Sequence, residues 1–251
     1  MTGRLAALGR AELVLLVRNR YALSMALLMP VLMVGALWSS FDRIDLGGNG
    51  MSAVGATLSG GIGMVLLFVV HVNLVSAYVA RREELVLKRL RTGEASDREI
   101  LTGTALPAAV LALGQCALLV AGGVVLLDVP APRRPELLVG GVLTGIVLLV
   151  VMAAATAALT RTVESAQLTT MPLLLVSSIG SGLFVPLEVF PGTVASVAEL
   201  LPLTGVMTLV RAGWLDGGNP GEPAGAAAVS LAWVMISVFA VRRWFRWEPR
   251  R

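Results

Sequence analysis

The chain has 251 residues, of which 56% are hydrophobic and only 14% are charged, and its mean hydropathy is +0.82. A soluble domain of this length carries about a quarter charged residues, so the composition excludes an ordinary water-soluble enzyme or binding module. The net charge of +4 does not indicate a nucleic-acid partner, because the basic residues flank long apolar runs, as they do beside membrane spans. We therefore predict an all-α integral membrane protein.

Residues 1–20, which precede the first apolar run, have the composition of an amphipathic helix. Several leucines gather on one side, and four arginines are available for lipid headgroups. We predict an interfacial helix on the cytoplasmic membrane surface; the alternative is a basic flank that only orients the first span. No small-x-small cleavage site follows, so we interpret the apolar run as a retained span rather than a signal peptide.

Six stretches without a charged residue are long enough to cross a bilayer, which takes about 20 apolar residues per helix. One Arg in the middle of such a helix costs about 2.5–3.5 kcal/mol, and none of the six contains one. The predicted spans are residues 21–41, 55–80, 103–127, 137–160, 165–187 and 223–241. The whole chain, residues 1–251, then forms a single membrane domain.

The distribution of basic residues predicts the orientation of these spans. With both termini in the cytoplasm, 16 of the 20 Lys and Arg residues lie on the cytoplasmic side, as the positive-inside rule requires. All but one of the 20 are Arg, which is typical of a GC-rich bacterial genome. We predict a multi-pass protein of the bacterial inner membrane with both termini cytoplasmic.

The cytoplasmic link between the second and third spans, residues 81–102, is predicted to be a helical hairpin. Its first arm continues the second span, with Glu84 and Lys88 spaced for an i,i+4 ion pair. Gly93 is a helix stop, and the segment from Ser96 to Glu99 is a capping box that begins the return helix. The link is therefore expected to protrude into the cytosol as a stiff arm.

Residues 188–222, between the fifth and sixth spans, are too apolar for an ordinary loop and too interrupted for a span. Pro191-Gly192 and Leu201-Pro202 bracket a short helical stretch, and glycines and Pro220 close the segment. We predict a pair of short helices that dip into the outer leaflet as an extracytoplasmic re-entrant segment, because irregular backbone at that depth must be covered by protein.

The sequence contains no nucleotide site of the phosphate-loop type. Such a loop needs a lysine beside Ser or Thr, and the sole lysine, Lys88, lies between Leu87 and Arg89. The sole histidine, His71, excludes a two-histidine metalloprotease site, and nothing brings it to Ser181 to form a hydrolase. We therefore predict no enzyme activity, no cofactor and no metal in this chain, and we place any ATP-driven step in a partner.

His71, with Asn73 nearby, is the ionisable group within the predicted spans. Such a group is a candidate proton relay or substrate contact. The alternative is a neutral histidine hydrogen-bonded within the helix bundle. Because no carboxylate lies in the spans to partner it, the sequence favours the second interpretation.

Gly141 and Gly145 in the fourth span match the small-xxx-small motif by which membrane helices pack closely. The motif can serve packing within the chain or contact between two copies. The sequence leaves both alternatives open.

Three stretches give the chain a resemblance to the ABC-2 type permeases, the transmembrane subunits of ATP-binding cassette exporters. They are residues 10–20 with the Pro30-containing span, the 81–103 hairpin, and the run Phe184-Val185-Pro186-Leu187, Phe190-Pro191, Leu201-Pro202-Leu203-Thr204 and Arg211. The resemblance covers almost the whole chain and rests on the order and spacing of these stretches. Many members carry a bulky residue after Pro-Leu-Thr, where this chain has Gly205.

This resemblance implies a six-span permease that pairs with a second copy, as a homodimer, and with separate ATP-binding subunits. The dimer would form the pathway for a drug, antibiotic, lipid or other amphipathic compound. Residues 188–222 would be the half-helices near the exit, and the permease itself would not hydrolyse ATP. The alternative is a non-transporting membrane protein, such as an immunity, sensor or assembly factor, on the same scaffold.

The same resemblance implies that the N-terminal helix and the two cytoplasmic loops contact the ATP-binding subunits. In the hairpin, the tip from Leu90 to Asp97 would be held by the partner, and Arg91 is suited to a bidentate pair with a carboxylate. The proposed contacts are Leu90, Arg91, Glu94 and Asp97, with Arg161 and Glu164 from the loop between the fourth and fifth spans. The alternative for the hairpin tip is a solvated turn whose arginines only orient the chain.

Overall fold

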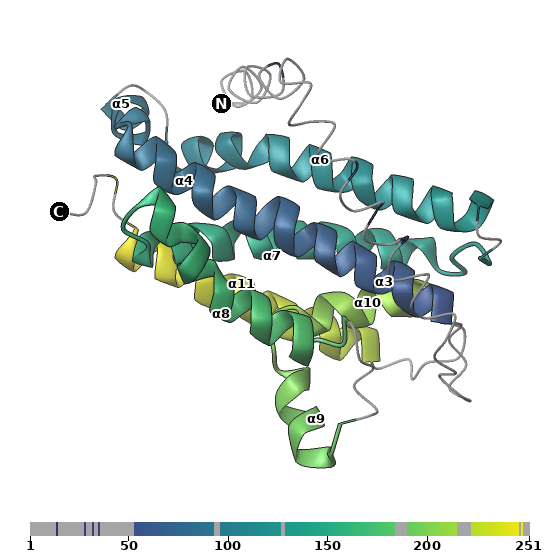
Figure 1. Ribbon diagram of the computed structural model, residues 1–251. Coiled ribbons are helices and arrows are strands. Elements are labelled where there is room, and N and C mark those ends of the chain that lie inside the picture. The colour runs from purple at the N-terminus through teal and green to yellow at the C-terminus, as the bar shows by residue number, and fades with distance from the viewer. Residues whose placement is uncertain are drawn as a thin grey trace.

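The computed structural model describes residues 53–92, 96–126, 129–183, 190–214, 222–245 and 247, together with the isolated positions 14, 28, 32 and 35. These residues form helices and connecting turns, with no strand in the described ranges. The helices run side by side as an elongated bundle (Figure 1). The predicted interfacial helix over residues 1–20 and the predicted span over residues 21–41 lie outside the described ranges.

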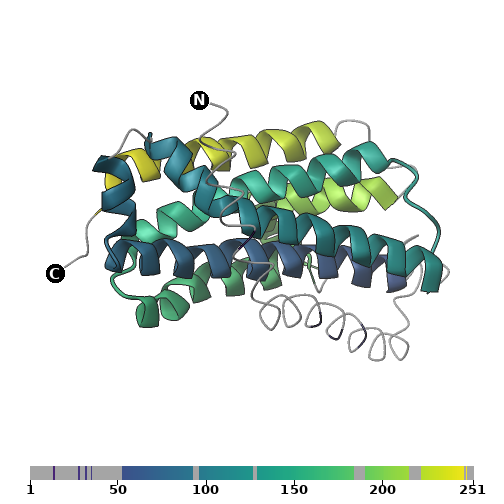
Figure 2. The ribbon, with the colours of Figure 1, turned by 90° about the horizontal axis from the view of Figure 1, so that it is seen from above.

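The helices follow the apolar runs of the sequence. In chain order they are α3 (Ala53–Val65), the π-helix η1 (Leu66–Val72), α4 (Asn73–Glu83), α5 (Val86–Thr92), α6 (Asp97–Leu126), α7 (Pro135–Leu159), α8 (Val163–Gly180), α9 (Gly192–Glu199), α10 (Thr204–Trp214) and α11 (Glu222–Trp244). The first three form one uninterrupted helical run, because both residues flanking η1 keep helical dihedrals. Seen from above, this run and α6 lie alongside each other (Figure 2).

Four helices are long and apolar enough to cross a membrane, and they match four of the six predicted spans. They are Leu58–Glu83, Asp97–Val125, Pro135–Leu159 and Glu222–Trp244. The predicted fifth span, residues 165–187, coincides with α8, which is not among these four. Its helix ends at Gly180, and residues 184–187 lie outside the described ranges. The total of six spans therefore stays a prediction.

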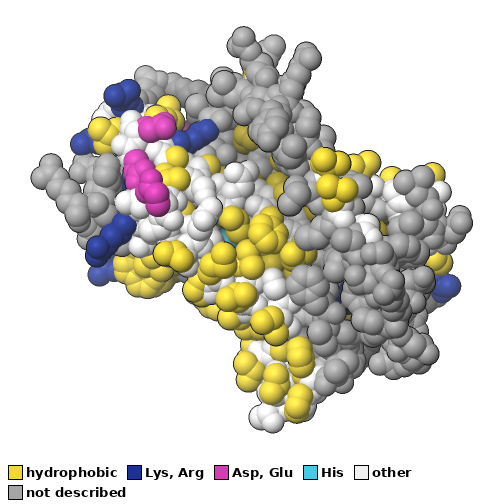
Figure 3. Space-filling model, in the orientation of Figure 1, with side chains coloured by type: hydrophobic (Ala, Val, Ile, Leu, Met, Phe, Trp, Pro, Cys, Tyr) yellow, Lys and Arg dark blue, Asp and Glu magenta, His cyan; other side chains and the backbone are white. Residues whose placement is uncertain are grey.

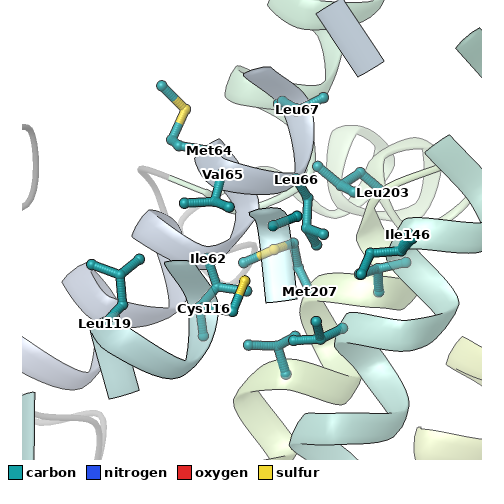
Figure 4. Close-up of a cluster of buried hydrophobic side chains, with 14 of the residues drawn as sticks. Ile62, Met64, Val65, Leu66, Leu67, Cys116, Leu119, Ile146, Leu203 and Met207 are labelled. Atoms are coloured by element: carbon teal, nitrogen blue, oxygen red, sulfur yellow. The ribbon is translucent and has the colours of Figure 1, made fainter. Parts of the chain in front are cut away.

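The main hydrophobic core lies where the α3–η1 run packs against α6, α7 and α10. Figure 4 shows side chains from these elements converging, among them Leu66, Cys116, Ile146 and Met207. Leu66 and Met207 are completely buried, and the single cysteine is a free thiol in this core. Because lipid is as apolar as leucine, such close packing, rather than escape from water, holds membrane helices together.

Both arms of the hairpin predicted over residues 81–102 are helical, with residues 93–95 between them outside the described ranges, but the first arm is not one straight helix. α4 ends at Glu83, Leu85 has a φ of 60°, and α5 begins at Val86. A residue with positive φ cannot continue a right-handed helix, so the chain changes direction here. The prediction that Glu84 and Lys88 pair along one continuous helix is wrong, because the break falls between them.

The return arm of the hairpin begins as the sequence predicts. The carboxylate of Glu99 accepts hydrogen bonds from the Ser96 backbone N–H at 2.8 Å and from the Ser96 hydroxyl at 2.7 Å. In return, the Glu99 N–H donates to the Ser96 hydroxyl oxygen at 3.3 Å. This reciprocal capping box is confirmed, and it satisfies N–H groups that have no partner within α6.

The interrupted segment before α11 forms two short helices, α9 and α10, bent by 95° at the turn between them. α10 lies along the first half of α7, where the Arg134 N–H donates to the Gly213 carbonyl at 3.0 Å. α9 projects from the side of the bundle (Figure 1). The predicted pair of short helices is confirmed, and its extracytoplasmic side stays a prediction.

Candidate functional site

The candidate site is one end of the bundle, which we call the hairpin end. It consists of α5, the start of α6, the turn between α7 and α8, and the end of α11 with Phe245 and Trp247. Lys, Arg, Asp and Glu side chains gather at this end, whereas hydrophobic side chains cover the face over α8 and α9 (Figure 3). A charged end on an otherwise apolar bundle is the surface that a water-soluble partner can reach.

Arg82 joins the base of the hairpin to the end of α7. Its guanidinium donates to the carbonyls of Ala157 at 2.8 Å, Thr160 at 2.5 Å and Arg161 at 3.2 Å, and the side chain is completely buried. The last carbonyls of a helix have no partner within it, and a cation there also complements the helix dipole. Removing the guanidinium would leave the two buried acceptors, the carbonyls of Ala157 and Thr160, unsatisfied, at about 1–3 kcal/mol each.

The neighbouring arginine ties the hairpin base to α6 instead. Arg81 donates to the Thr104 hydroxyl oxygen at 3.1 Å. One turn earlier in α4, the buried Tyr78 hydroxyl donates to the Leu101 carbonyl at 2.9 Å. The two adjacent arginines, which the sequence analysis counted only as orienting charges, therefore fasten the hairpin to two different helices.

Two of the predicted contact residues at the hairpin tip meet each other. The Arg91 Nε lies 3.1 Å from Asp97 Oδ1, and both side chains are about half exposed, at 51% each. The Arg91 guanidinium also lies over the ring of Trp247, at 5.1 Å from its centroid. Leu90 is half-buried, and Glu94 lies outside the described residues.

The aromatic residues after α11 extend this contact to the base of the hairpin. The rings of Phe245 and Trp247 meet edge to face at 5.0 Å, and those of Tyr78 and Phe245 at 6.5 Å. A line of side chains therefore connects α4, the end of the chain and the hairpin tip. These aromatics were not among the predicted site residues, although their place among C-terminal arginines is a pattern that could have indicated cation–π contact.

The second predicted contact set, Arg161 and Glu164, is exposed at the same end of the bundle. Thr162 and Ser165 form a reciprocal capping box at the start of α8, with the Thr162 N–H donating to Ser165 Oγ at 3.0 Å. Hydrogen bonds from its own backbone N–H and from Thr162 hold the pKa of Glu164 below its ordinary value. Glu164 is therefore a fixed, solvent-facing carboxylate.

His71 and Asn73 are not brought together. His71 lies in η1 and is completely buried, whereas Asn73 is exposed. The Leu149 backbone approaches the imidazole, but neither ring nitrogen completes a hydrogen bond with the described part of the chain. His71 is therefore buried, as the interpretation of a neutral, packed histidine expects. The hydrogen bond that this interpretation also assumed is not seen among the described residues.

Gly141 and Gly145 pack within the chain. A Cβ atom at Gly141 would lie 3.0 Å from the Val210 backbone nitrogen, and one at Gly145 would lie 2.8 Å from side-chain atoms of Leu66 and Val206. α10 therefore occupies the groove that the two glycines open. This geometry favours packing within the chain, because the space beside the motif is filled by this chain's own helix.

Gly205 also lies where the packing leaves no room for a side chain. A Cβ atom there would collide with the Ala226 carbonyl and would lie 2.5 Å from the Ser230 hydroxyl oxygen on α11. The bulky residue that many ABC-2 permeases have at this place does not fit in this chain.

Comparison with known proteins adds one finding to this geometry. A family model described as ABC-2 type transporter matches residues 4–215, which is most of the chain. No curated protein matches it. The matched range includes the hairpin, the turn between α7 and α8, and both short helices.

Proposed function

The chain belongs to the ABC-2 type transporter family, a family of membrane permease components, and we propose that it is the permease of an exporter driven by a separate ATPase. The observation that carries the proposal is the hairpin end. It gathers both predicted contact loops on one charged face and fastens them to the membrane helices through the buried Arg82. A soluble motor needs such a face to act on a bundle that binds no nucleotide itself.

We also propose the side of the membrane on which the ATPase lies. The hairpin end carries most of the Lys and Arg residues that the structure describes, which favours the cytoplasm of a bacterial cell, with both termini on that side. The proposed contacts are Leu90, Arg91, Glu94 and Asp97 of the hairpin, with Arg161 and Glu164 of the turn between α7 and α8. Because Arg91 is already held by Asp97 and Trp247, it presents a fixed cation to the partner.

The permease is further proposed to work as a pair of identical copies, with the substrate passing between them. Apolar side chains on the projecting α9 and directly after it are exposed, with Val197 of α9 and Leu200, the residue that follows it, each at 64%. Neighbouring residues of α8, such as Ile179, are exposed as well. A second copy that covers this surface would enclose a path lined by apolar side chains, which favours a drug, antibiotic, lipid or other amphipathic substrate.

A charge exchange tests the proposed contact with the ATPase. The double variant Arg91→Glu, Asp97→Arg keeps an ion pair at the tip but reverses the charges that a partner meets. The chain offers a matched control at the opposite end of the bundle, where Arg134 and Glu136 form a similarly exposed pair at 3.4 Å. Tagged permease should retain its ATPase with the Arg134→Glu, Glu136→Arg exchange and lose it with the hairpin exchange.

Two outcomes would contradict this proposal. If wild-type permease purified from its native membrane brings no ATP-binding subunit with it, the chain is a non-transporting member of the family, such as an immunity, sensor or assembly factor. If both exchanges retain the ATPase equally, an ATPase is present but the hairpin tip does not hold it.

A further inference from the structure

α7 connects the hairpin end to the short helices. Its last turn and the two residues after it receive the three hydrogen bonds of Arg82, while its first half packs against α10. The α3–η1–α4 run and α11 also contact α10, but among the described helices α7 alone both packs there and accepts the hydrogen bonds of Arg82. Any displacement of the hairpin base therefore acts directly on α7.

The attachment at the hairpin end is specific to Arg82. Its guanidinium is completely buried and reaches three carbonyls that belong to the end of α7 and the turn after it. Separating α4 from α7 would strand a buried cation and the carbonyl oxygens that it satisfies, which is strongly unfavourable. The planar fork of an arginine makes these bonds at fixed angles, which a lysine cannot reproduce.

The first half of α7 is attached to α10 by a row of close backbone approaches, which we call the glycine seam. Gly141 and Gly145 of α7 admit Val206 and Val210 of α10, and Gly213 of α10 admits Leu138, whose backbone nitrogen would lie 2.8 Å from an added Cβ. Contacts this tight let one helix move only with the other, because packed interiors transmit displacement rather than absorb it. α10 therefore follows α7.

Between the two attachments α7 is an unbroken α-helix of 25 residues, about 37 Å long, with its only proline at the start. Two other helical segments also pack against α10. The α3–η1–α4 run contains the π-helix η1 and is followed by the bend at Leu85. α11 is unbroken, but it meets the hairpin through the aromatic contacts of Phe245 and Trp247, which follow it, and not through a buried charge. Prolines and π-turns are places where helices bend instead of transmitting force.

We propose that α7 carries the movement of the hairpin to the α9–α10 pair, with Arg82 as the positioning residue that engages it. This inference rests on the proposed function, since it concerns how an ATPase bound at the hairpin end acts on the opposite half of the bundle. Arg82 touches neither ATP nor substrate and acts through α7. The glycine seam then turns movement of α7 into movement of α10 and of the α9 attached to it.

A fluorescent reporter on α9 tests the inference without knowledge of the substrate. The parent protein carries Cys116→Ala, which removes the only native thiol, and Val197→Cys, at an exposed position, labelled with bimane. The complex with its co-purified ATPase is placed in lipid nanodiscs. Bimane emission is then compared without nucleotide and with ATP plus orthovanadate, which traps the ATPase after hydrolysis.

We expect trapping to shift the emission of the parent, and Arg82→Lys to reduce the shift on the order of fivefold, within the range of coupling losses caused by such mutations. ATPase retention should not change. Arg81→Gln is the matched control, because Arg81 has the same chemistry one residue away but bonds to Thr104 on α6; its shift should persist. Should Arg82→Lys fold poorly, Gly145→Ala tests the other attachment and is expected to reduce the shift as well.

A full shift in folded Arg82→Lys, or in Gly145→Ala, would overturn the role of α7. The absence of any shift in a parent that retains a vanadate-sensitive ATPase would also overturn it, while leaving the proposed function intact. Failure of the parent to retain an ATPase would instead contradict the proposed function.

Discussion

The Arg91 guanidinium lies against the indole of Trp247, with its central carbon 5.1 Å from the ring centroid, while its Nε bonds to Asp97 at 3.1 Å. A residue of the hairpin tip is thus held from two sides, by the return helix and by the end of the chain. These two contacts give Arg91 a structural role in addition to its proposed role at the ATPase.

Trp247→Ala should loosen the hairpin tip. An exposed cation–π contact contributes about 0.5–1 kcal/mol, so we expect amide hydrogen exchange in α5 to become faster, by roughly twofold to fivefold. Trp244→Ala is the control, because Trp244 is a nearby tryptophan, at the end of α11, that has no contact with Arg91 among the described interactions. Equal exchange in both variants would show that the ring of Trp247 does not hold the tip.

Three glycine-to-alanine variants should separate close packing from open space. Gly141→Ala and Gly205→Ala each place a Cβ against backbone of a neighbouring helix and should destabilise the protein by about 1–3 kcal/mol. Gly140→Ala meets nothing within 4 Å and should be neutral or slightly stabilising, because alanine favours a helix. Thermal unfolding in detergent measures all three. A loss in Gly140→Ala as large as in Gly141→Ala would contradict the glycine seam with α10.

His71→Leu tests whether the buried histidine is needed for its polarity. Neither ring nitrogen has a hydrogen-bond partner among the described residues, so an apolar side chain removes two unsatisfied groups at once. Such a replacement is nearly neutral or stabilising, and we expect an unchanged or higher midpoint of thermal unfolding. ATPase activity of the complex should also persist. Normal folding and assembly with complete loss of that activity would instead support a proton relay or substrate contact.

Membrane topology follows from the charge distribution and is checked by single cysteines in the Cys116→Ala background. Thr92→Cys lies at the exposed hairpin tip, and Glu136→Cys lies exposed at the start of α7, at the opposite end. In intact cells a membrane-impermeant maleimide should label position 136 and not position 92. The reverse pattern would invert the orientation.

Much of this architecture could be predicted from residue patterns. Absence of charge over long runs located four of the spans, because a buried charge is costly in lipid, and Ser96 and Glu99 marked the start of α6 by a purely local rule. The bend at Leu85 could not be predicted, since leucine has no preference for a positive φ and only tertiary packing places it there.

The connections at the hairpin end depended on contacts distant in sequence. Arg82 reaches Ala157, 75 positions away, and no local pattern distinguishes it from Arg81, which bonds to a different helix. The motif at Gly141 and Gly145 predicted close packing but not its partner, which is α10 of the same chain. Sequence patterns therefore located the candidate site, whereas the structure determined what its residues connect.

ATP hydrolysis by the affinity-purified chain in nanodiscs, measured before and after its associated subunits are stripped away, is the decisive test of the proposed function. We expect vanadate-sensitive hydrolysis in the intact complex, its complete loss from the stripped permease, and its return when the stripped ATP-binding subunit is added back. Hydrolysis that stays with the isolated permease, or its absence from the intact complex, would contradict the claim that this chain is the membrane component on which a separate ATPase acts.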